Sequence, residues 1–129
     1  MSEARARLDA LPNLYPKLFP RGPLPWGFEV SDGWSELVAI LYARIDSILR
    51  EAHGARMQVV QVKEKFGALR FYYRLEGVDA SISAAIREAV TLAEAASTHI
   101  CERCGCPGEH RTGGGWFVTL CAACSATDP

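Results

Sequence analysis

Apolar residues recur at helical spacing in the first half of the chain. Between residues 34 and 49 they fall three or four positions apart, which predicts one amphipathic helix of about four turns. Ser31 or Asp32 is placed to cap its start, and Gly54 to end it. The single apolar stripe indicates a helix that faces the core.

A second stripe, of isoleucine, valine and alanine, predicts a helix over residues 80–98, capped by Asp79 or Ser81. Its small side chains suit close packing on a helix or sheet. The helix leads directly to Cys101, so whatever follows is expected to be docked on the core.

Alternation of apolar and polar residues predicts two strands over residues 56–75, joined by a turn at residues 65–67. On the second strand, one face is apolar and is expected to join the core: Leu69, Phe71, Tyr73 and Leu75. The opposite face carries Arg70, Tyr72 and Arg74.

Most of the prolines lie in residues 12–33, which indicates extended or irregular backbone. Its apolar side chains are too many for a free linker and are expected to lie against the core: Leu14, Tyr15, Leu18, Phe19, Trp26 and Phe28. A proline-rich ligand for a partner protein is the functional alternative.

All five cysteines lie in the last quarter of the chain, and four form two CxxC pairs with sixteen residues between them. This spacing is typical of a zinc site in which two tight turns present four thiolates. Disulfides and a redox CxxC are the alternatives, but no export signal and no βαβ pattern accompany the pairs. We therefore predict one structural Zn²⁺ bound by Cys101, Cys104, Cys121 and Cys124.

The remaining candidate ligands of this segment are Cys106, His99 and His110. Four thiolates already complete a tetrahedron, so Cys106 is expected to point away and His110 to be solvated at a hairpin tip. Residues 116–121 predict a strand, and the tail after Cys124 is too short for the helix of a treble-clef finger. The segment is therefore expected to be ribbon-like.

These elements predict an α+β fold, with two amphipathic helices packed on a β-hairpin or small antiparallel sheet. Residues 1–100 form the core with a proline-rich N-terminal arm, and residues 101–129 a docked zinc-ribbon-like module.

Charge is balanced overall, with a formal net charge of −1, but it is unevenly placed. The predicted hairpin gathers Arg56, Lys63, Lys65, Arg70 and Arg74 against the single acid Glu64. Bases interleaved with aromatics are typical of single-stranded nucleic-acid binding, and they also occur at protein interfaces and on ordinary solvated strands. The candidate binding residues are Lys63, Lys65, Arg70, Tyr72 and Arg74.

The N-terminus has no apolar signal core, and no apolar run is long enough to span a membrane. These observations predict a cytoplasmic protein without a membrane partner. They leave its oligomeric state open.

Taken together, "DGW", "QVKEKFGALRFYY", "CERCGCPG" and "GWFVTLC" resemble a set of small uncharacterised proteins of bacteria and their phages. The resemblance extends over residues 14–124, and Cys106 falls outside its pattern. It implies a bacterial or prophage setting and supplies no activity.

A binding or regulatory protein without enzymatic activity is the resulting prediction, for example an inhibitor of a host or phage nucleic-acid-processing defence system. The partner is a protein complex or single-stranded nucleic acid. A small metal-dependent hydrolase that uses Glu64, His110 and a second metal is the enzymatic alternative.

Overall fold

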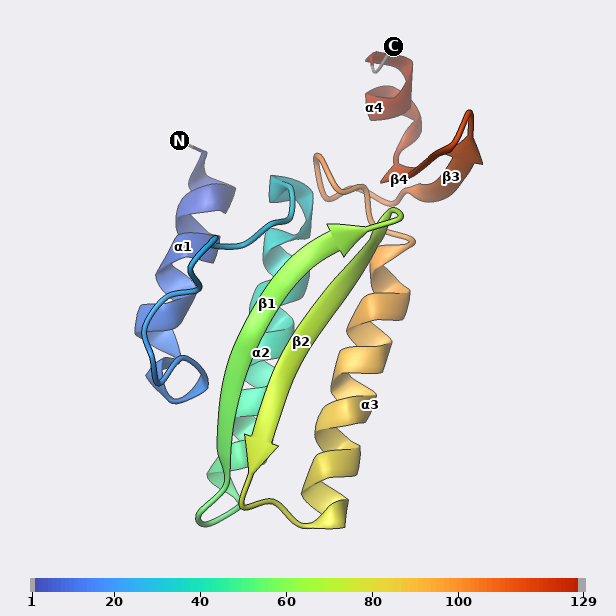
Figure 1. Cartoon of the computed structure of the whole chain (residues 1–129). Coiled ribbons are helices and arrows are strands. Elements are labelled where there is room, and N and C mark those ends of the chain that lie inside the picture. Colours follow the sequence, from blue (N-terminus) through green and yellow to red (C-terminus); the bar gives the residue numbers. More distant parts are fainter. Residues whose placement is uncertain (1, 128–129) are drawn as a thin grey trace.

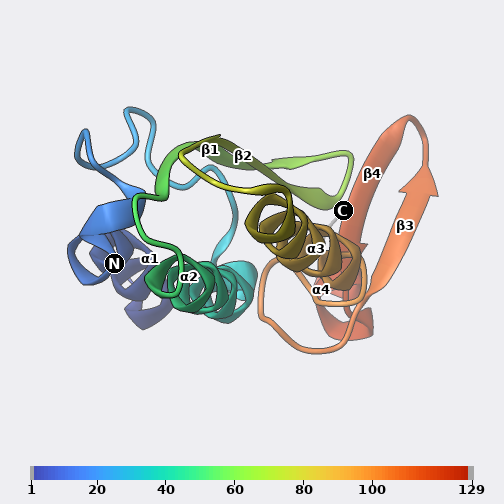
Figure 2. The ribbon, with the colours of Figure 1, turned by 90° about the horizontal axis from the view of Figure 1, so that it is seen from below.

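A computed structural model of the chain describes residues 2–127 and shows two packed layers (Figures 1 and 2). Helices α2 (Ser35–Arg50) and α3 (Ala80–Ser97) lie side by side in one layer. The other layer is an antiparallel ribbon of β1 (Arg56–Lys65) and β2 (Ala68–Glu76). The predicted α+β class is confirmed.

Both predicted helices form close to their expected bounds. The α2 helix is entered through a single 3-10 turn, Asp32–Trp34, and the Ser31 side chain makes no capping bond. At the start of α3, Asp79 is the cap, because its carboxylate accepts a hydrogen bond of 2.8 Å from the Ile82 N–H.

The core is centred on Tyr42, which α2 buries completely. Four aromatic rings surround it with centroid distances of 5.3 to 6.3 Å: Tyr15, Phe19, Phe28 and Phe71. Three of these rings come from the first 28 residues and one from β2. The N-terminal arm is thereby packed onto the helices and the ribbon.

The ribbon has the predicted faces, and groups from other elements occupy parts of both its edges. Leu69 and Phe71 are buried and Tyr72 is exposed. On the β2 edge, the Leu69 N–H donates to Ser97 Oγ and the Phe71 N–H to Glu94 Oε2, both at 2.9 Å.

On the β1 edge, the N–H of Glu29 donates to the Val62 carbonyl at 2.9 Å, and the Glu64 N–H donates to the Glu29 carbonyl at 3.0 Å. The arm therefore adds a short parallel bridge to this edge of the ribbon. The outer face of the ribbon is left uncovered, as Figure 2 shows.

The expectation of irregular backbone from residue 12 was wrong at its start, because α1 (Glu3–Leu14) continues through Pro12. Ser2 caps this helix by accepting a hydrogen bond from the Arg5 N–H, and Leu8 and Leu11 bury one face of it. A proline in the last turn removes only one of the final hydrogen bonds. Burial of the two leucines therefore stabilises the helix by more than Pro12 destabilises it.

The arm buries only part of its apolar set. Leu18, Phe19 and Phe28 are buried, as expected. The same expectation was wrong for Leu14 and Trp26, which are 64% and 79% exposed. Leu14 falls on the outer side of α1, and Trp26 lies in a turn that the Gly27 N–H closes onto the Leu24 carbonyl.

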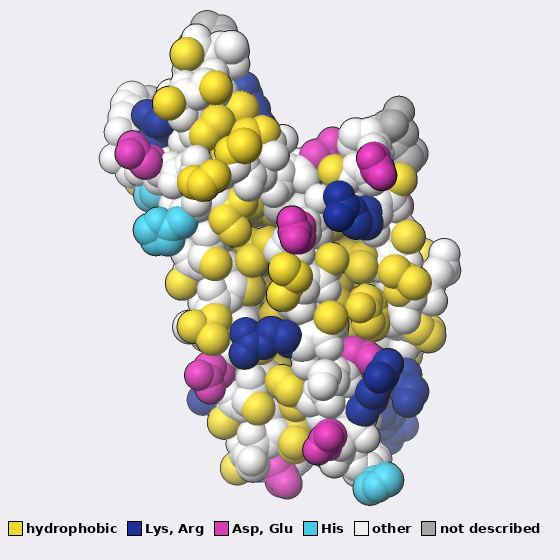
Figure 3. Space-filling model, turned by 180° about the vertical axis from the view of Figure 1, so that it is seen from behind, with side chains coloured by type: hydrophobic (Ala, Val, Ile, Leu, Met, Phe, Trp, Pro, Cys, Tyr) yellow, Lys and Arg dark blue, Asp and Glu magenta, His cyan; other side chains and the backbone are white. Residues whose placement is uncertain are grey.

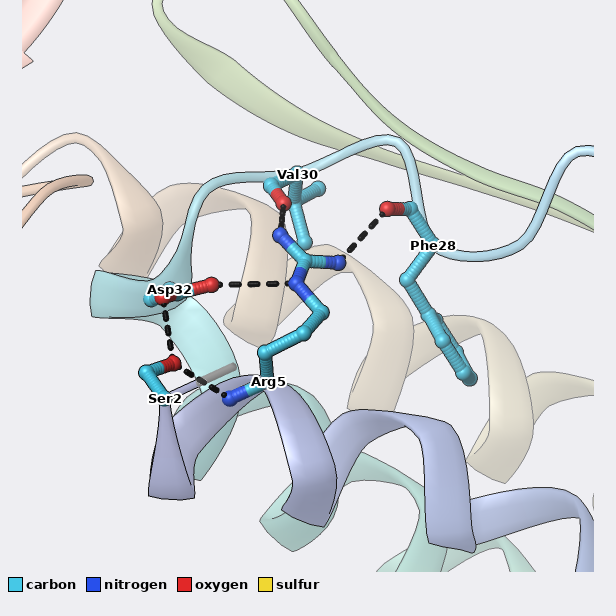
Figure 4. Close-up of polar contacts among 5 residues, drawn as sticks. All are labelled: Ser2, Arg5, Phe28, Val30 and Asp32. Atoms are coloured by element: carbon cyan, nitrogen blue, oxygen red, sulfur yellow. Dashed lines mark hydrogen bonds and ion pairs between the residues drawn. The ribbon is translucent and has the colours of Figure 1, made fainter.

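Arg5 fastens the arm to α1 (Figure 4). Its guanidinium donates to the carbonyl of Phe28 at 3.0 Å and to that of Val30 at 2.5 Å, and its Nε pairs with Asp32 at 3.0 Å. The Ser2 hydroxyl donates to the other oxygen of Asp32 at 2.6 Å. The hydrogen bond from Ser2 and the charge of Arg5 hold the pKa of Asp32 below its usual value, although partial burial opposes them.

Replacing Asp32 with asparagine should remove a pH-dependent part of the stability. A carboxyl whose pKa is lower in the folded state stabilises the fold above its unfolded pKa of about 3.9, and this contribution disappears as the pH falls through the lower folded value. The difference in urea midpoint between wild type and Asp32→Asn should therefore shrink with acidification. A difference that stays constant down to about pH 3 would contradict this assignment.

The C-terminal quarter forms a second hairpin, β3 (Glu109–Gly113) and β4 (Trp116–Leu120), followed by α4 (Ala122–Thr127) (Figure 1). The expectation that no helix follows the second cysteine pair was wrong. The α4 helix starts inside that pair, and the Ser125 N–H donates to the Cys121 carbonyl at 2.9 Å.

No described helix is long and apolar enough to cross a membrane.

Candidate metal centre and contact surface

The two CxxC pairs come together beyond the C-terminal end of α3, which Cys101 follows in the chain. The sulfur atoms of Cys101, Cys104, Cys121 and Cys124 all lie within 4.8 Å of one another. None of the five cysteines forms a disulfide, and the Cys104 and Cys121 sulfurs are 3.6 Å apart, far beyond the disulfide bond length of about 2.05 Å. The four predicted ligands are positioned to hold a metal ion.

The spacing of the sulfurs fits a tetrahedral ion. Metal–sulfur bonds of about 2.3 Å in a tetrahedron place the sulfurs about 3.8 Å apart, close to the Cys104–Cys121 distance. A tetrahedral set of four thiolates suits zinc and also iron.

Backbone N–H groups favour the thiolate form at this centre. Burial of Cys101 opposes its ionisation, but the N–H groups of Cys121, Cys104 and Arg103 point at its sulfur and lower its pKa to about 6. The Cys124 N–H, 3.4 Å from the Cys121 sulfur, similarly lowers the pKa of Cys121. Thiolates are the form that binds metal, so the folded backbone favours the metal-binding form of one cysteine in each pair. The Cys106 N–H lowers the pKa of Cys104, but hydrogen bonds with the neighbouring cysteine side chains outweigh it and raise the pKa of Cys104 and of Cys124.

The start of α2 anchors the first pair. The Trp34 indole N–H donates to the Ile100 carbonyl at 2.9 Å, one residue before Cys101. Gly33 lies against the backbone of Cys101 and Glu102, and its N–H donates to the Glu102 carbonyl at 2.9 Å. The "DGW" sequence thus joins the core to the cysteine pair.

Glu102 ties the first pair to β4. Its backbone N–H donates to the Thr119 carbonyl, and its carboxylate accepts from the Thr119 N–H, each at 3.0 Å. Burial raises the pKa of Glu102, although the hydrogen bond from Thr119 opposes the shift.

The turn of the β1–β2 ribbon fits against β4. The Thr119 hydroxyl donates to the Gly67 carbonyl at 2.6 Å. Gly67 has a φ of +78°, and a Cβ at this position would lie 2.8 Å from the Val118 nitrogen. Only glycine satisfies both the backbone angle and the close approach.

Replacing Gly67 with alanine should destabilise the metal-loaded protein by about 1–3 kcal/mol, because the strained backbone angle adds to a clash with β4. Urea unfolding measures the change. Gly113→Ala is the matched control, since nothing lies within 4 Å of its Cβ position. Equal stability of the two variants would contradict this role of Gly67.

The other candidate ligands stay outside the cysteine cluster. Cys106 and His99 are exposed. The placement of His110 at the hairpin tip was wrong: it lies within β3, its Nδ1 is 3.3 Å from the Thr119 hydroxyl, and Gly114 and Gly115 form the tip. A glycine run places a turn only loosely, and the pairing of Gly113 with Trp116 puts the turn at Gly114 and Gly115.

Glu64 serves the ribbon turn, where its carboxylate accepts the Gly67 N–H at 2.7 Å. Among the described residues, the four cysteines are the only group of three or more potential ligands that converge, so Glu64 and His110 do not form a second metal cluster.

The predicted basic residues share the outer face of the ribbon. Lys63 pairs with Arg70 across the strands, Gln61 with Tyr72 and Gln58 with Arg74. Within residues 2–127, no ion pair links Arg56, Lys63, Lys65, Arg70 or Arg74 to a carboxylate. We call these five cations and Tyr72 the basic face.

The opposite side of the molecule differs in character (Figure 3). There, apolar side chains are spread over much of the face, and basic and acidic side chains are scattered among them. A shallow groove between α2 and α3, lined by Ile40, Leu92 and Arg44, forms part of this side.

Sequence reasoning missed a groove at the junction of the ribbon turn, α3 and the second hairpin. Its main residues are Phe66, Arg70, Glu94, Thr98, His110 and Phe117. Phe66 lies in the turn next to Gly67, and its side chain is 57% exposed. The available signal was an aromatic residue directly before the turn glycine, which is an unusual choice for a tight turn.

Comparison of the chain with protein-family models, curated proteins and solved structures finds no match.

Proposed function

We propose that this chain is a non-enzymatic binding protein whose C-terminal quarter is stabilised by one structural Zn²⁺ and whose contact surface is the basic face. Zinc is the natural occupant of four thiolates at this spacing, and four protein ligands leave no open coordination position for catalysis. The metal would hold the second hairpin in place and take no part in binding chemistry.

The observation that carries the proposal is the concentration of unpaired cations on an uncovered sheet face. Three of the nearby acids are otherwise engaged: Glu64 and Glu94 accept backbone N–H groups, and Glu29 accepts from Gln61. Glu76, opposite Arg56, is the one described acid on this face, and it lies at the far end from Lys63, Lys65 and Arg70. In a chain with a net charge of −1, this arrangement makes a local positive field directed at an anionic partner.

The bacterial or prophage setting that the resemblance implies is compatible with the finer proposal that this contact regulates or inhibits a nucleic-acid-processing system. Such a role needs a compact surface and no catalytic group. The chain would act by occupying an anionic surface of a larger machine.

The test is a double charge reversal, Arg70→Glu with Arg74→Glu, in metal-loaded protein. We expect the variant to fold, because both side chains point outward, and to lose capture of the macromolecule that wild type retains from a bacterial lysate. Arg7→Glu with Arg44→Glu is the matched control, since it makes the same charge change at exposed helical positions.

Equal capture by wild type and both double variants would contradict the basic face as contact surface. A zinc-loaded wild type that turns over a substrate, with loss of turnover in Glu64→Gln or His110→Ala, would overturn the non-enzymatic assignment in favour of the hydrolase.

A further inference from the structure

The groove beside the ribbon turn, with a volume of about 680 Å³, contains a cluster of aromatic side chains. The rings of Phe66 and Phe117 meet edge to face with centroids 5.5 Å apart, and the His110 ring lies 6.2 Å from that of Phe117, with the two planes 25° apart. Phe117 is 43% exposed. These rings come from two hairpins that are held together by the Thr119–Gly67 hydrogen bond.

The backbone at Phe66 gives an independent reason to look for a function. Phe66 and Gly67 have φ angles of +57° and +78°, the combination of a type I′ turn, in which asparagine and glycine are favoured. A bulky aromatic residue at such a position is an outlier, and outliers of this kind cluster at functional sites.

Charge continues from the basic face into the groove. Arg70 belongs to both surfaces, and the Lys65 ammonium lies 5.4 Å from the centre of the Phe66 ring. The groove also contains the carboxylate of Glu94, which already accepts the Phe71 N–H and disfavours a phosphate beside it. A phosphate is therefore favoured outside the groove and an uncharged ring inside it.

From this geometry we infer that the groove holds a base of single-stranded nucleic acid, stacked on Phe66 or Phe117, while the adjacent phosphates contact Arg70 and Lys65. The inference rests on the proposed function, because it names the class of partner that the basic face binds. Aromatic platforms beside a cationic track are how proteins bind single strands without reading their sequence.

An acidic protein partner would account only for the cations of the basic face. Protein interfaces bury aromatic rings too, but rings grouped beside cations around an open groove are better suited to a planar base, which would cover them with ring-on-ring contact. The groove therefore favours nucleic acid over an acidic protein.

The experiment measures fluorescence anisotropy of a labelled mixed-sequence DNA oligonucleotide of about 12 nucleotides with metal-loaded protein. Phe66→Asn should fold normally, because asparagine suits the turn, and should bind roughly 5- to 100-fold more weakly with an unchanged salt dependence. Arg70→Gln should instead reduce the salt slope by about 0.7. Trp26→Ala, which removes a ring that is 79% exposed and belongs to the N-terminal arm, should bind like wild type.

Amide chemical-shift mapping on wild-type protein tests the site without any substitution. Residues 66–70 and 110–117 should move together as the oligonucleotide is added. Movement confined to other residues would overturn the groove as the base site, as would full binding by Phe66→Asn and Phe117→Leu.

The outcomes also separate this inference from the proposed function. If wild type binds no oligonucleotide but retains a protein partner that Arg70→Glu with Arg74→Glu releases, the inference fails and the proposed function stands. If neither nucleic acid nor protein responds to that double reversal, both fail.

Discussion

Replacing Cys121 with serine should release the metal and unfold the chain from about residue 100 onward. Structural zinc contributes on the order of 10 kcal/mol to folding of the segment that binds it, and the second hairpin has little apolar core of its own. Trp116 is 79% exposed and only Thr119 and Leu120 of β4 are buried. Few contacts would therefore hold this segment without the ion.

Elemental analysis and limited proteolysis measure the two effects. Wild type purified without chelator should contain one zinc per chain, and Cys121→Ser should contain little and be cleaved readily after residue 100. Cys106→Ser is the matched control and should keep its zinc. Full zinc content in Cys121→Ser, or iron in place of zinc in wild type, would overturn the proposed centre.

Replacing Trp34 with alanine should cost about 3–5 kcal/mol of stability, because Trp34 is completely buried and its loss leaves a large cavity. The substitution also leaves the Ile100 carbonyl without its indole donor. Since that carbonyl immediately precedes Cys101, metal should be released to a chelator more rapidly than from wild type.

Trp26→Ala removes the same side chain from a site that is 79% exposed and should change the unfolding midpoint little. Trp34→Phe keeps most of the packing and isolates the hydrogen bond, with an expected cost of about 1–3 kcal/mol. If a chelator removed metal from Trp34→Ala at the wild-type rate, the contact between Trp34 and the Ile100 carbonyl would have no effect on metal binding.

Strong periodicity explains why the two main helices and the ribbon could be predicted from sequence. Their apolar faces are long, and their ends carry local signals such as Asp79. The α1 helix was missed because Pro12 and the following prolines outweighed two leucines, Leu8 and Leu11, whose burial depends on distant partners.

The cysteine cluster was predictable because its signal is local. A CxxC pair fixes two ligands within four residues, and two pairs complete the set. The groove was not predictable, because Phe66, Thr98 and Phe117 meet only when two hairpins dock beside α3. The expected position of His110 at a hairpin tip also separated it from the other residues of the groove. A glycine run does not determine the register in which two strands pair.

The occupied edges of the β1–β2 ribbon restrict how any partner can attach. Strand addition needs free N–H and carbonyl groups along an edge, and Ser97, Glu94 and Glu29 already use several of them. A peptide therefore has no continuous edge to extend the sheet at these positions, and neither does a second copy of this chain. A partner at these positions therefore has to contact side chains on the outer face of the ribbon. Such binding depends on charge and on aromatic rings, and it does not require that the partner have a polypeptide backbone.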